Sequence, residues 1–133
     1  MNDQPVLPTY MGPNIRGLIP ALVGPTYAPL PSWMPSLAAA PRRVLLVVDG
    51  LGWDQLTERW ALAPTLASME ATTITTVAPS TTATALTSIT TGLTPGEHGL
   101  IGYRIDVGRD VLNVLRWRNE SADLRRVHQP RSL

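Results

Sequence analysis

The sequence of 133 residues contains no cysteine, no phenylalanine and no lysine. Without cysteine it has no disulfide framework and no thiolate site for zinc or an iron–sulfur cluster. Without lysine it has no P-loop, no Schiff-base chemistry and no lysine general base. Eleven arginines against ten acidic residues leave a formal charge of +1. This balance argues against the broad basic face of a nucleic-acid-binding protein.

Signals for export and membrane insertion are missing as well. The N-terminal stretch has no basic segment followed by an apolar run, and prolines interrupt the apolar stretch of residues 17–40. We therefore expect a cytoplasmic chain without a membrane span. A length of 133 residues with 44% apolar content suits one domain rather than two.

Proline is concentrated at the start of the chain, where the first 41 residues hold nine of the 13 prolines. We expect residues 1–41 to form an extended, turn-rich leader that packs on the core, and residues 42–133 to form the core. The run from Val44 to Val48 is aliphatic throughout, which predicts a strand buried on both faces that ends at Asp49-Gly50. A helix is predicted for residues 53–62, closed by Pro64.

A second strand and a second helix are predicted in the threonine-rich segment that follows. Residues 72–77 suit a strand by their β-propensity. A helix follows, with Gly92 as its stop. Its buried stripe would consist of Ala85, Leu86, Ile89 and Leu93. Two alternating runs, 103–107 and 111–117, predict a β-hairpin around residues 108–110. Strand, turn and helix in this order indicate an α/β fold.

Asp49 directly follows the first predicted strand, at the edge where open α/β sheets bind their ligands. This position makes it a candidate metal ligand, although an Asp-Gly pair can also be a simple turn. A dinucleotide fingerprint fits poorly. Its third glycine position holds Gln55, and Asp49 and Asp54 would place negative charge beside a pyrophosphate.

Hydroxyl groups gather at Ser80, Thr81 and Thr82, just after the second predicted strand and at the start of the next helix. Each of them can be read as an N-cap. A hydroxyl in this place can also be a nucleophile, because the helix dipole and free N–H groups stabilise an alkoxide and an incoming phosphate. No histidine or lysine lies nearby in sequence, so the expected activator is a divalent metal held in part by Asp49.

Three motifs, taken in order, resemble the type I phosphodiesterase/nucleotide pyrophosphatase branch of the alkaline phosphatase superfamily. They are VLLVVDGLG at residues 44–52, APSTT at 78–82 and TGLTPGEHGLIGY at 91–103. The resemblance implies a metal-dependent hydrolase of phosphodiester or nucleotide pyrophosphate bonds, acting on a small phosphate ester or nucleotide. It also implies an alkaline-phosphatase-like α/β sandwich with a mainly parallel central sheet, and two zinc ions in the complete protein.

The resemblance assigns roles to single residues. Asp49 falls on the metal-binding aspartate, and Thr82 falls on the nucleophile, which is also a metal ligand. Thr81 is the nearest competitor, since the Ser-Thr-Thr run allows a slip of one residue. His98 matches an HG element that implies a structural role. Ala85 stands where the family often has an asparagine that contacts phosphate, so the phosphate contacts of this chain would differ.

The resemblance covers about residues 41–117, roughly the N-terminal third of a family catalytic domain. It therefore implies an incomplete catalytic domain whose remaining zinc ligands follow Leu133, because Asp49 and Thr82 are two ligands where zinc usually takes three or four. Nothing in the resemblance makes His128 a ligand. Two alternatives stay open. The chain is an inactive fragment with unpaired strand edges, or it is a small phosphate-binding α/β module.

Overall fold

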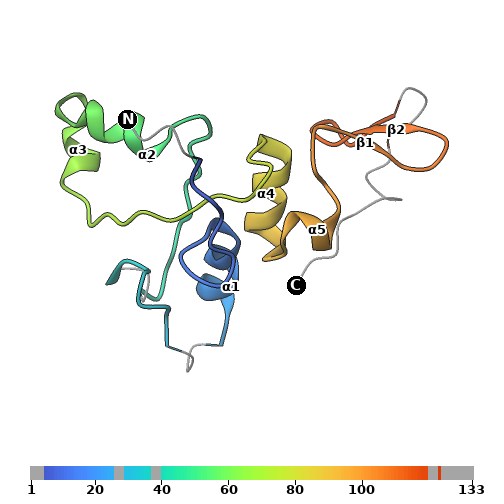
Figure 1. Cartoon of the computed structure of the whole chain (residues 1–133). Helices are drawn as coiled ribbons and strands as arrows, with labels where there is room; N and C mark the ends of the chain where they lie inside the picture. The colour runs from blue at the N-terminus through green and yellow to red at the C-terminus, as the bar shows by residue number, and fades with distance from the viewer. Residues whose placement is uncertain (1–4, 26–28, 37–39, 120–122, 124–133) are drawn as a thin grey trace.

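The computed structural model describes residues 5–25, 29–36, 40–119 and 123. Its elements are listed in chain order: η1 (Ile15–Gly17), α1 (Leu18–Val23), α2 (Trp53–Glu58), η3 (Trp60–Leu62), α3 (Pro64–Ala67), α4 (Thr82–Thr91), α5 (Pro95–His98), β1 (Arg104–Asp106) and β2 (Val111–Asn113), where η marks a 3-10 turn. Helix α4 lies at the centre, between α1 and α5, and the hairpin of β1 and β2 lies beyond α5 (Figure 1). Among the described residues, every helix is too short or too polar to cross a bilayer. His128 lies outside the described residues.

Strands β1 and β2 form an antiparallel pair, which confirms the predicted hairpin. Arg104 lies opposite Asn113, and Ile105 lies opposite Leu112. The face of Leu112 is buried and belongs to a small apolar cluster, whereas the face of Arg104 is exposed. The cluster consists of Ala83, Leu100, Leu112 and Val114, with Ile105, Val107 and Trp117 packed against it.

The predicted strand at 44–48 is wrong for this structure. Residues 43–48 are extended, but they pair with no other strand of the described chain. Their side chains are exposed, from 39% for Leu45 to 96% for Val44. An aliphatic run forms a strand only when a neighbour takes up its N–H and C=O groups, and the sole sheet of the described residues is the distant hairpin. Neither the parallel central sheet nor the sandwich is therefore present in that part of the chain.

The second predicted strand, 72–77, is reduced to a single parallel bridge between Thr75 and Asn14. The N–H of Ile15 donates to the carbonyl of Thr75 at 3.0 Å, and the N–H of Thr75 donates to the carbonyl of Pro13 at 2.9 Å. Asn14 is completely buried, and its amide donates to Thr75 Oγ1 at 3.0 Å and to the carbonyl of Thr76 at 2.8 Å. These bonds hold the start of the chain against the segment that leads into α4.

Helix α4 forms as predicted and ends at Gly92, which adopts a left-handed conformation with φ 71°. Its buried face differs from the predicted apolar stripe, of which Ile89 is buried and Leu86 is 38% exposed. The buried polar residues of the helix are Thr84, Thr87, Ser88 and Thr91. Hydroxyl groups can be buried here because the helix itself supplies acceptors. Thr87 donates to the carbonyl of Ala83 at 2.8 Å.

The helix predicted for 53–62 is shorter than expected, because α2 ends at Glu58 and the 3-10 turn η3 follows it. Pro64 does not close this helix but opens α3, since proline suits the first helical turn, where no N–H bond is needed. The rings of Trp53 and Trp60 meet edge to face, with centroids 5.5 Å apart, and hold α2 against η3.

The stop at Gly92 gives a test of the fold around α4. We expect Gly92→Ala to lower the free energy of unfolding by about 1 kcal/mol, because a Cβ is strained at φ 71°. Gly96→Ala is the matched control. Gly96 lies inside α5, and a Cβ there would meet no atom within 4 Å. Urea unfolding of both variants checks this expectation, and an equal loss in the two would contradict it.

Candidate functional site

The structure brings Asp49 and Thr82 together although 33 positions separate them in sequence. The hydroxyl of Thr82 donates a hydrogen bond of 2.9 Å to Asp49 Oδ2. Both side chains are exposed, so a dissolved ligand can reach them. A carboxylate and a threonine hydroxyl therefore meet at the surface, next to the first turn of α4.

Asp49 is placed by the turn that ends the extended segment 43–48. Gly50, its neighbour, has φ 74°, a conformation that glycine adopts without strain. A Cβ at Gly50 would meet nothing within 4 Å, so the backbone angle, and not crowding, is the reason for glycine there. The turn directs the chain away toward α2 and leaves the Asp49 carboxylate beside α4.

Thr82 is placed by the start of α4 and by the segment before it. Val77 is 1% exposed, and the N–H of Ala78 donates to the hydroxyl of Tyr10 at 3.1 Å. The chain then passes through a cis Ala78–Pro79 peptide and enters the helix at Thr82, with Thr81 as the N-cap residue. A buried side chain and a tyrosine from the start of the sequence thus fix the entry to the helix.

The first N–H groups of α4 have no acceptor within the described residues. The side chain of Thr81 makes no capping bond to the helix, because its hydroxyl pairs with the Thr84 hydroxyl at 2.9 Å. The first backbone bond of the helix comes from the N–H of Ala85 to the carbonyl of Thr81. In the described part of the chain, the N–H groups of residues 82–84 therefore lack a partner at the positive end of the helix dipole, and of these three residues only Thr82 is exposed, whereas Ala83 and Thr84 are buried.

Thr81 and Thr82 differ in what surrounds their hydroxyls. Thr82 faces the carboxylate of Asp49, whereas Thr81 faces the buried Thr84. Ala85 is half-buried one turn further along, and its methyl group offers no hydrogen bond to a ligand. The hydroxyl of Thr82 is therefore the one that lies beside a carboxylate.

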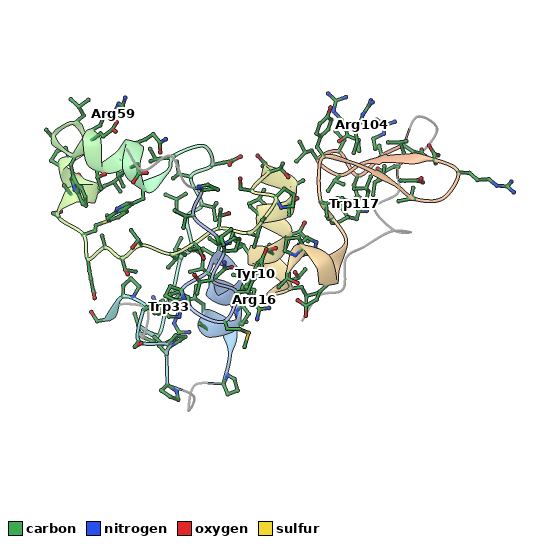
Figure 2. The ribbon with its side chains drawn as sticks, viewed as in Figure 1. Tyr10, Arg16, Trp33, Arg59, Arg104 and Trp117 are labelled. Atoms are coloured by element: carbon green, nitrogen blue, oxygen red, sulfur yellow. The ribbon has the colours of Figure 1, made fainter. Side chains whose placement is uncertain are left out.

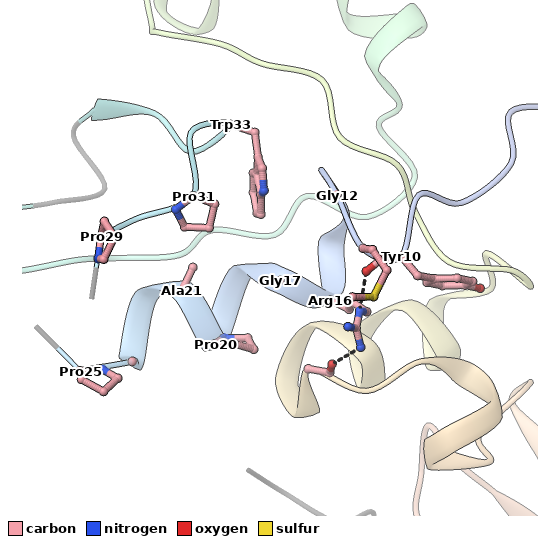
Figure 3. A pocket seen from close by; sticks show the side chains of 13 residues that line it. Tyr10, Gly12, Arg16, Gly17, Pro20, Ala21, Pro25, Pro29, Pro31 and Trp33 are labelled. Atoms are coloured by element: carbon pink, nitrogen blue, oxygen red, sulfur yellow. Dashed lines mark hydrogen bonds between the residues drawn. The ribbon is translucent and has the colours of Figure 1, made fainter. Parts of the chain in front are cut away.

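Arg16 holds the other end of α4, and sequence reasoning missed it. Its guanidinium donates to the carbonyl of Gly92 at 3.1 Å and to the carbonyl of Tyr10 at 3.0 Å, as the dashed lines in Figure 3 show. Glu97 lies 3.8 Å from the same group. The bond to Gly92 spans 76 positions, and no local pattern predicts such a contact. The sequence feature that lies nearest to Arg16 is Asn14, a residue type that favours helix starts. Its side chain accepts from the N–H of Arg16 and so caps η1.

His98 joins α5 to α4 through both nitrogens of its ring. Nδ1 accepts from the N–H of Leu100 at 3.0 Å, so the neutral ring carries its proton on Nε2 and donates to Ser88 Oγ at 2.9 Å. Burial lowers the pKa of His98, and the nearby Glu97 partly opposes this. A ring engaged at both nitrogens ties the two helices together and has no free nitrogen for a metal.

Glu97 closes the turn before His98 by a capping box. Its carboxylate accepts from the N–H of Thr94 at 2.7 Å and from the Thr94 hydroxyl at 2.8 Å, and these bonds lower the pKa of Glu97. The box begins at Thr94, two residues after the left-handed Gly92, and α5 ends at Gly99 with φ 74°. Two glycine stops and one capping box thus set the path from α4 to the hairpin.

Asp49 and Thr82 offer oxygen atoms of the type that hard divalent cations and zinc accept. The described residues hold no group of three or more His, Asp or Glu side chains that could bind a metal together. The two side chains therefore fit a metal site, because both offer oxygen ligands and both are exposed. Two ligands are too few for a stable zinc site, which usually takes three or four from the protein.

Residues 43–130, about two thirds of the chain, match the family model of type I phosphodiesterase / nucleotide pyrophosphatase. The chain belongs to this family. The match begins at the extended segment before Asp49 and includes Thr82, α5 and the hairpin. No curated protein and no solved structure matches the chain.

The lowered pKa of the half-buried His98 leads us to expect that stability depends on pH. Its pKa is below 6.5 in the folded state, so between that value and 6.5 the unfolded chain binds more protons. We expect the free energy of unfolding to rise with pH through this window and to fall on acidification. Denaturant unfolding at a series of pH values checks this expectation. His98→Gln is the control variant, and if its free energy of unfolding depends on pH as strongly as that of the wild type, His98 is not the group responsible.

Proposed function

We propose that this member of the type I phosphodiesterase/nucleotide pyrophosphatase family hydrolyses phosphodiester or nucleotide pyrophosphate bonds, with Thr82 as nucleophile. The observation that carries the proposal is the 2.9 Å bond from the Thr82 hydroxyl to the Asp49 carboxylate, at the amide end of α4. Substrates of this class carry a phosphate anion, and the amide end of α4, where Thr82 is exposed, suits its oxygens.

Thr82 Oγ1 forms the new bond to phosphorus, and the bond from phosphorus to the leaving oxygen breaks in line with it. The Thr82 hydroxyl releases its proton to solvent, and the leaving group departs with its oxygen and takes up one proton from solvent. A water molecule then attacks the phosphothreonine, which releases the phosphate product and restores the hydroxyl. The sum is one water consumed for each phosphate ester or pyrophosphate bond broken. The N–H groups of Thr82 and Ala83 receive the charge that develops on the phosphoryl oxygens.

Asp49 orients the Thr82 hydroxyl and would hold a divalent cation together with it. The family resemblance implies that this cation is zinc. When bound, it would lower the pKa of the Thr82 hydroxyl and offset the negative charge of the phosphate. Further ligands for it must come from outside the described residues, since Asp49 and Thr82 are two donors.

A second function is phosphate binding without turnover. The unpaired N–H groups at the amide end of α4 favour it, because a helix N-terminus attracts phosphate, although the carboxylate of Asp49 beside Thr82 opposes such binding. The two functions differ in what a chelator does. Removal of metal stops hydrolysis, whereas it leaves simple phosphate binding intact.

The nucleophile is tested by steady-state release of p-nitrophenol from p-nitrophenyl thymidine monophosphate, with zinc present and the protein as its natural gene encodes it. We expect Thr82→Ala to lower turnover by at least about 10³-fold, because the covalent route is lost. Thr81→Ala retains turnover, since its hydroxyl faces Thr84.

Thr90→Ala is the matched control for this test. Thr90 is exposed on α4, and its hydroxyl bonds to carbonyls of its own helix, so its loss leaves the site unchanged. Retained turnover in Thr82→Ala, or a loss in Thr81→Ala alone, assigns the nucleophile elsewhere.

The metal role of Asp49 is tested by calorimetric titration with zinc. We expect Asp49→Asn to weaken binding at least about tenfold, because a carboxylate ligand becomes a neutral amide. Asp54→Asn makes the same charge change at an exposed position inside α2 and leaves the affinity unchanged. Equal weakening in both variants would mean that only the overall charge matters.

A further inference from the structure

A second cluster of chemistry-bearing side chains lies on the hairpin, away from Asp49 and Thr82. A pocket of about 350 Å³ is lined by Arg104, Val111, Asn113, Arg116, Arg118 and Asn119. Three of the six lining residues are arginines and two are asparagines, so the polar lining is rich in N–H donors. Among the described residues, none that lines this pocket carries a carboxylate.

The backbone sets these side chains in a row. Arg104 lies opposite Asn113 in the antiparallel pair, and Arg118 lies opposite Asn113 from the other side through an isolated bridge. The N–H of Asn113 donates to the carbonyl of Arg118 at 2.7 Å, and the N–H of Arg118 returns a bond of 3.2 Å. Residues directly opposite each other in such pairs present their side chains on the same face. Arg104 and Arg118 therefore flank Asn113 on one face.

The turn between β2 and Arg118 adds the third arginine. The N–H of Arg116 donates to Asn113 Oδ1 at 3.1 Å, which fixes the turn. Trp117 has φ 52° and packs against the apolar cluster on the opposite face. Figure 2 shows Arg104 and Trp117 on opposite sides of the hairpin ribbon. The tryptophan thus anchors the turn to the core while its two arginine neighbours line the pocket.

The three guanidinium groups have no ion-pair partner within the described part of the chain, where ion pairs involve Arg16 and Arg59. Three carboxylates stand near the row. Asp106 accepts from the N–H of Gly108, Asp110 accepts from the side-chain amide of the lining residue Asn119, and Asp123 lies opposite Arg118 in the backbone bridge. None of the three is among the residues that line the pocket. Three like charges around one pocket repel one another, and a bound anion removes that repulsion.

We propose that this pocket binds a phosphate group, as inorganic phosphate, as pyrophosphate or at the end of a nucleotide. Arginine presents several N–H donors in a planar fork that matches two phosphate oxygens at once, and three such forks suit a multiply charged anion better than a single carboxylate. The site is separate from Thr82, and it stands whether or not the proposed hydrolysis occurs.

Calorimetric titration of the chelator-treated protein with inorganic phosphate and with pyrophosphate, at fixed ionic strength, tests the proposal. We expect saturable binding of one anion, with pyrophosphate the tighter. Arg104→Ala, Arg116→Ala and Arg118→Ala each weaken it at least about tenfold, because each removes charged hydrogen bonds. Arg109→Ala is the matched control. It removes one exposed positive charge in the hairpin turn, outside the pocket, and changes affinity less than about twofold.

Two further variants keep the result unambiguous. Arg104→Lys retains the charge and the aliphatic stem, so the hairpin stays folded, and the loss of the fork still weakens binding. Thr82→Ala leaves this affinity unchanged, which separates the pocket from the Thr82 hydroxyl, and the losses in the arginine variants separate it from the amide end of α4. The same titration with thymidine monophosphate distinguishes the two kinds of ligand. If thymidine monophosphate binds more tightly than inorganic phosphate, the pocket takes a nucleotide; if the two bind equally, it takes the free anion.

Three outcomes overturn the proposal. The first is the absence of saturable heat with phosphate and pyrophosphate. The second is an equal effect of Arg109→Ala and Arg104→Ala, which reduces the pocket to overall charge. The third is loss of phosphate binding in Thr82→Ala, because the anion then binds at α4. Heat from duplex DNA without heat from phosphate has the same force, because the ligand is then a polymer.

Discussion

The buried amide of Asn14 is the interaction on which the arrangement around α4 depends. It is completely inaccessible, and its bonds to Thr75, Thr76 and the N–H of Arg16 satisfy both ends of the carboxamide. An unpaired amide in such a place is costly, so these bonds specify one position for the start of the chain. From that position Tyr10 reaches the N–H of Ala78, and Arg16 reaches the carbonyl of Gly92. The two ends of α4 are thus held by the same few residues.

The elements that could be predicted are those with local causes. Gly92 ends α4 because the stop needs only one residue in a left-handed conformation, and the hairpin follows from alternation on both sides of Gly108. Thr81 occupies the N-cap position of α4, which hydroxyl residues favour, although its hydroxyl bonds to that of Thr84 and not to a helix N–H. The proximity of Asp49 and Thr82 was expected from the family motifs, and the structure gives the distance.

The features that could not be predicted depend on partners far away in sequence. Residues 44–48 have the composition of a strand, but they pair with no other strand of the described chain. Composition alone therefore gave a wrong prediction for this segment. On α4 the apolar residue Leu86 stays at the surface while Thr84 is buried. η1 and α1 pack against this helix, and internal bonds satisfy the buried hydroxyls. Arg16 and Asn14 act across more than 60 positions, and the pattern of a single sequence contains no record of such contacts.

The bond from Arg16 to Gly92 has an electrical consequence for α4. A helix has partial negative charge at its carbonyl end and partial positive charge at its amide end, and these normally offset each other at a distance. Here the Arg16 guanidinium, which also lies near Glu97, faces the carbonyl end, and the Asp49 carboxylate faces the amide end beside Thr82. Each end of the dipole therefore meets a side chain of opposite charge, so an anion that approaches Thr82 encounters the carboxylate of Asp49 as well as the N–H groups of the helix.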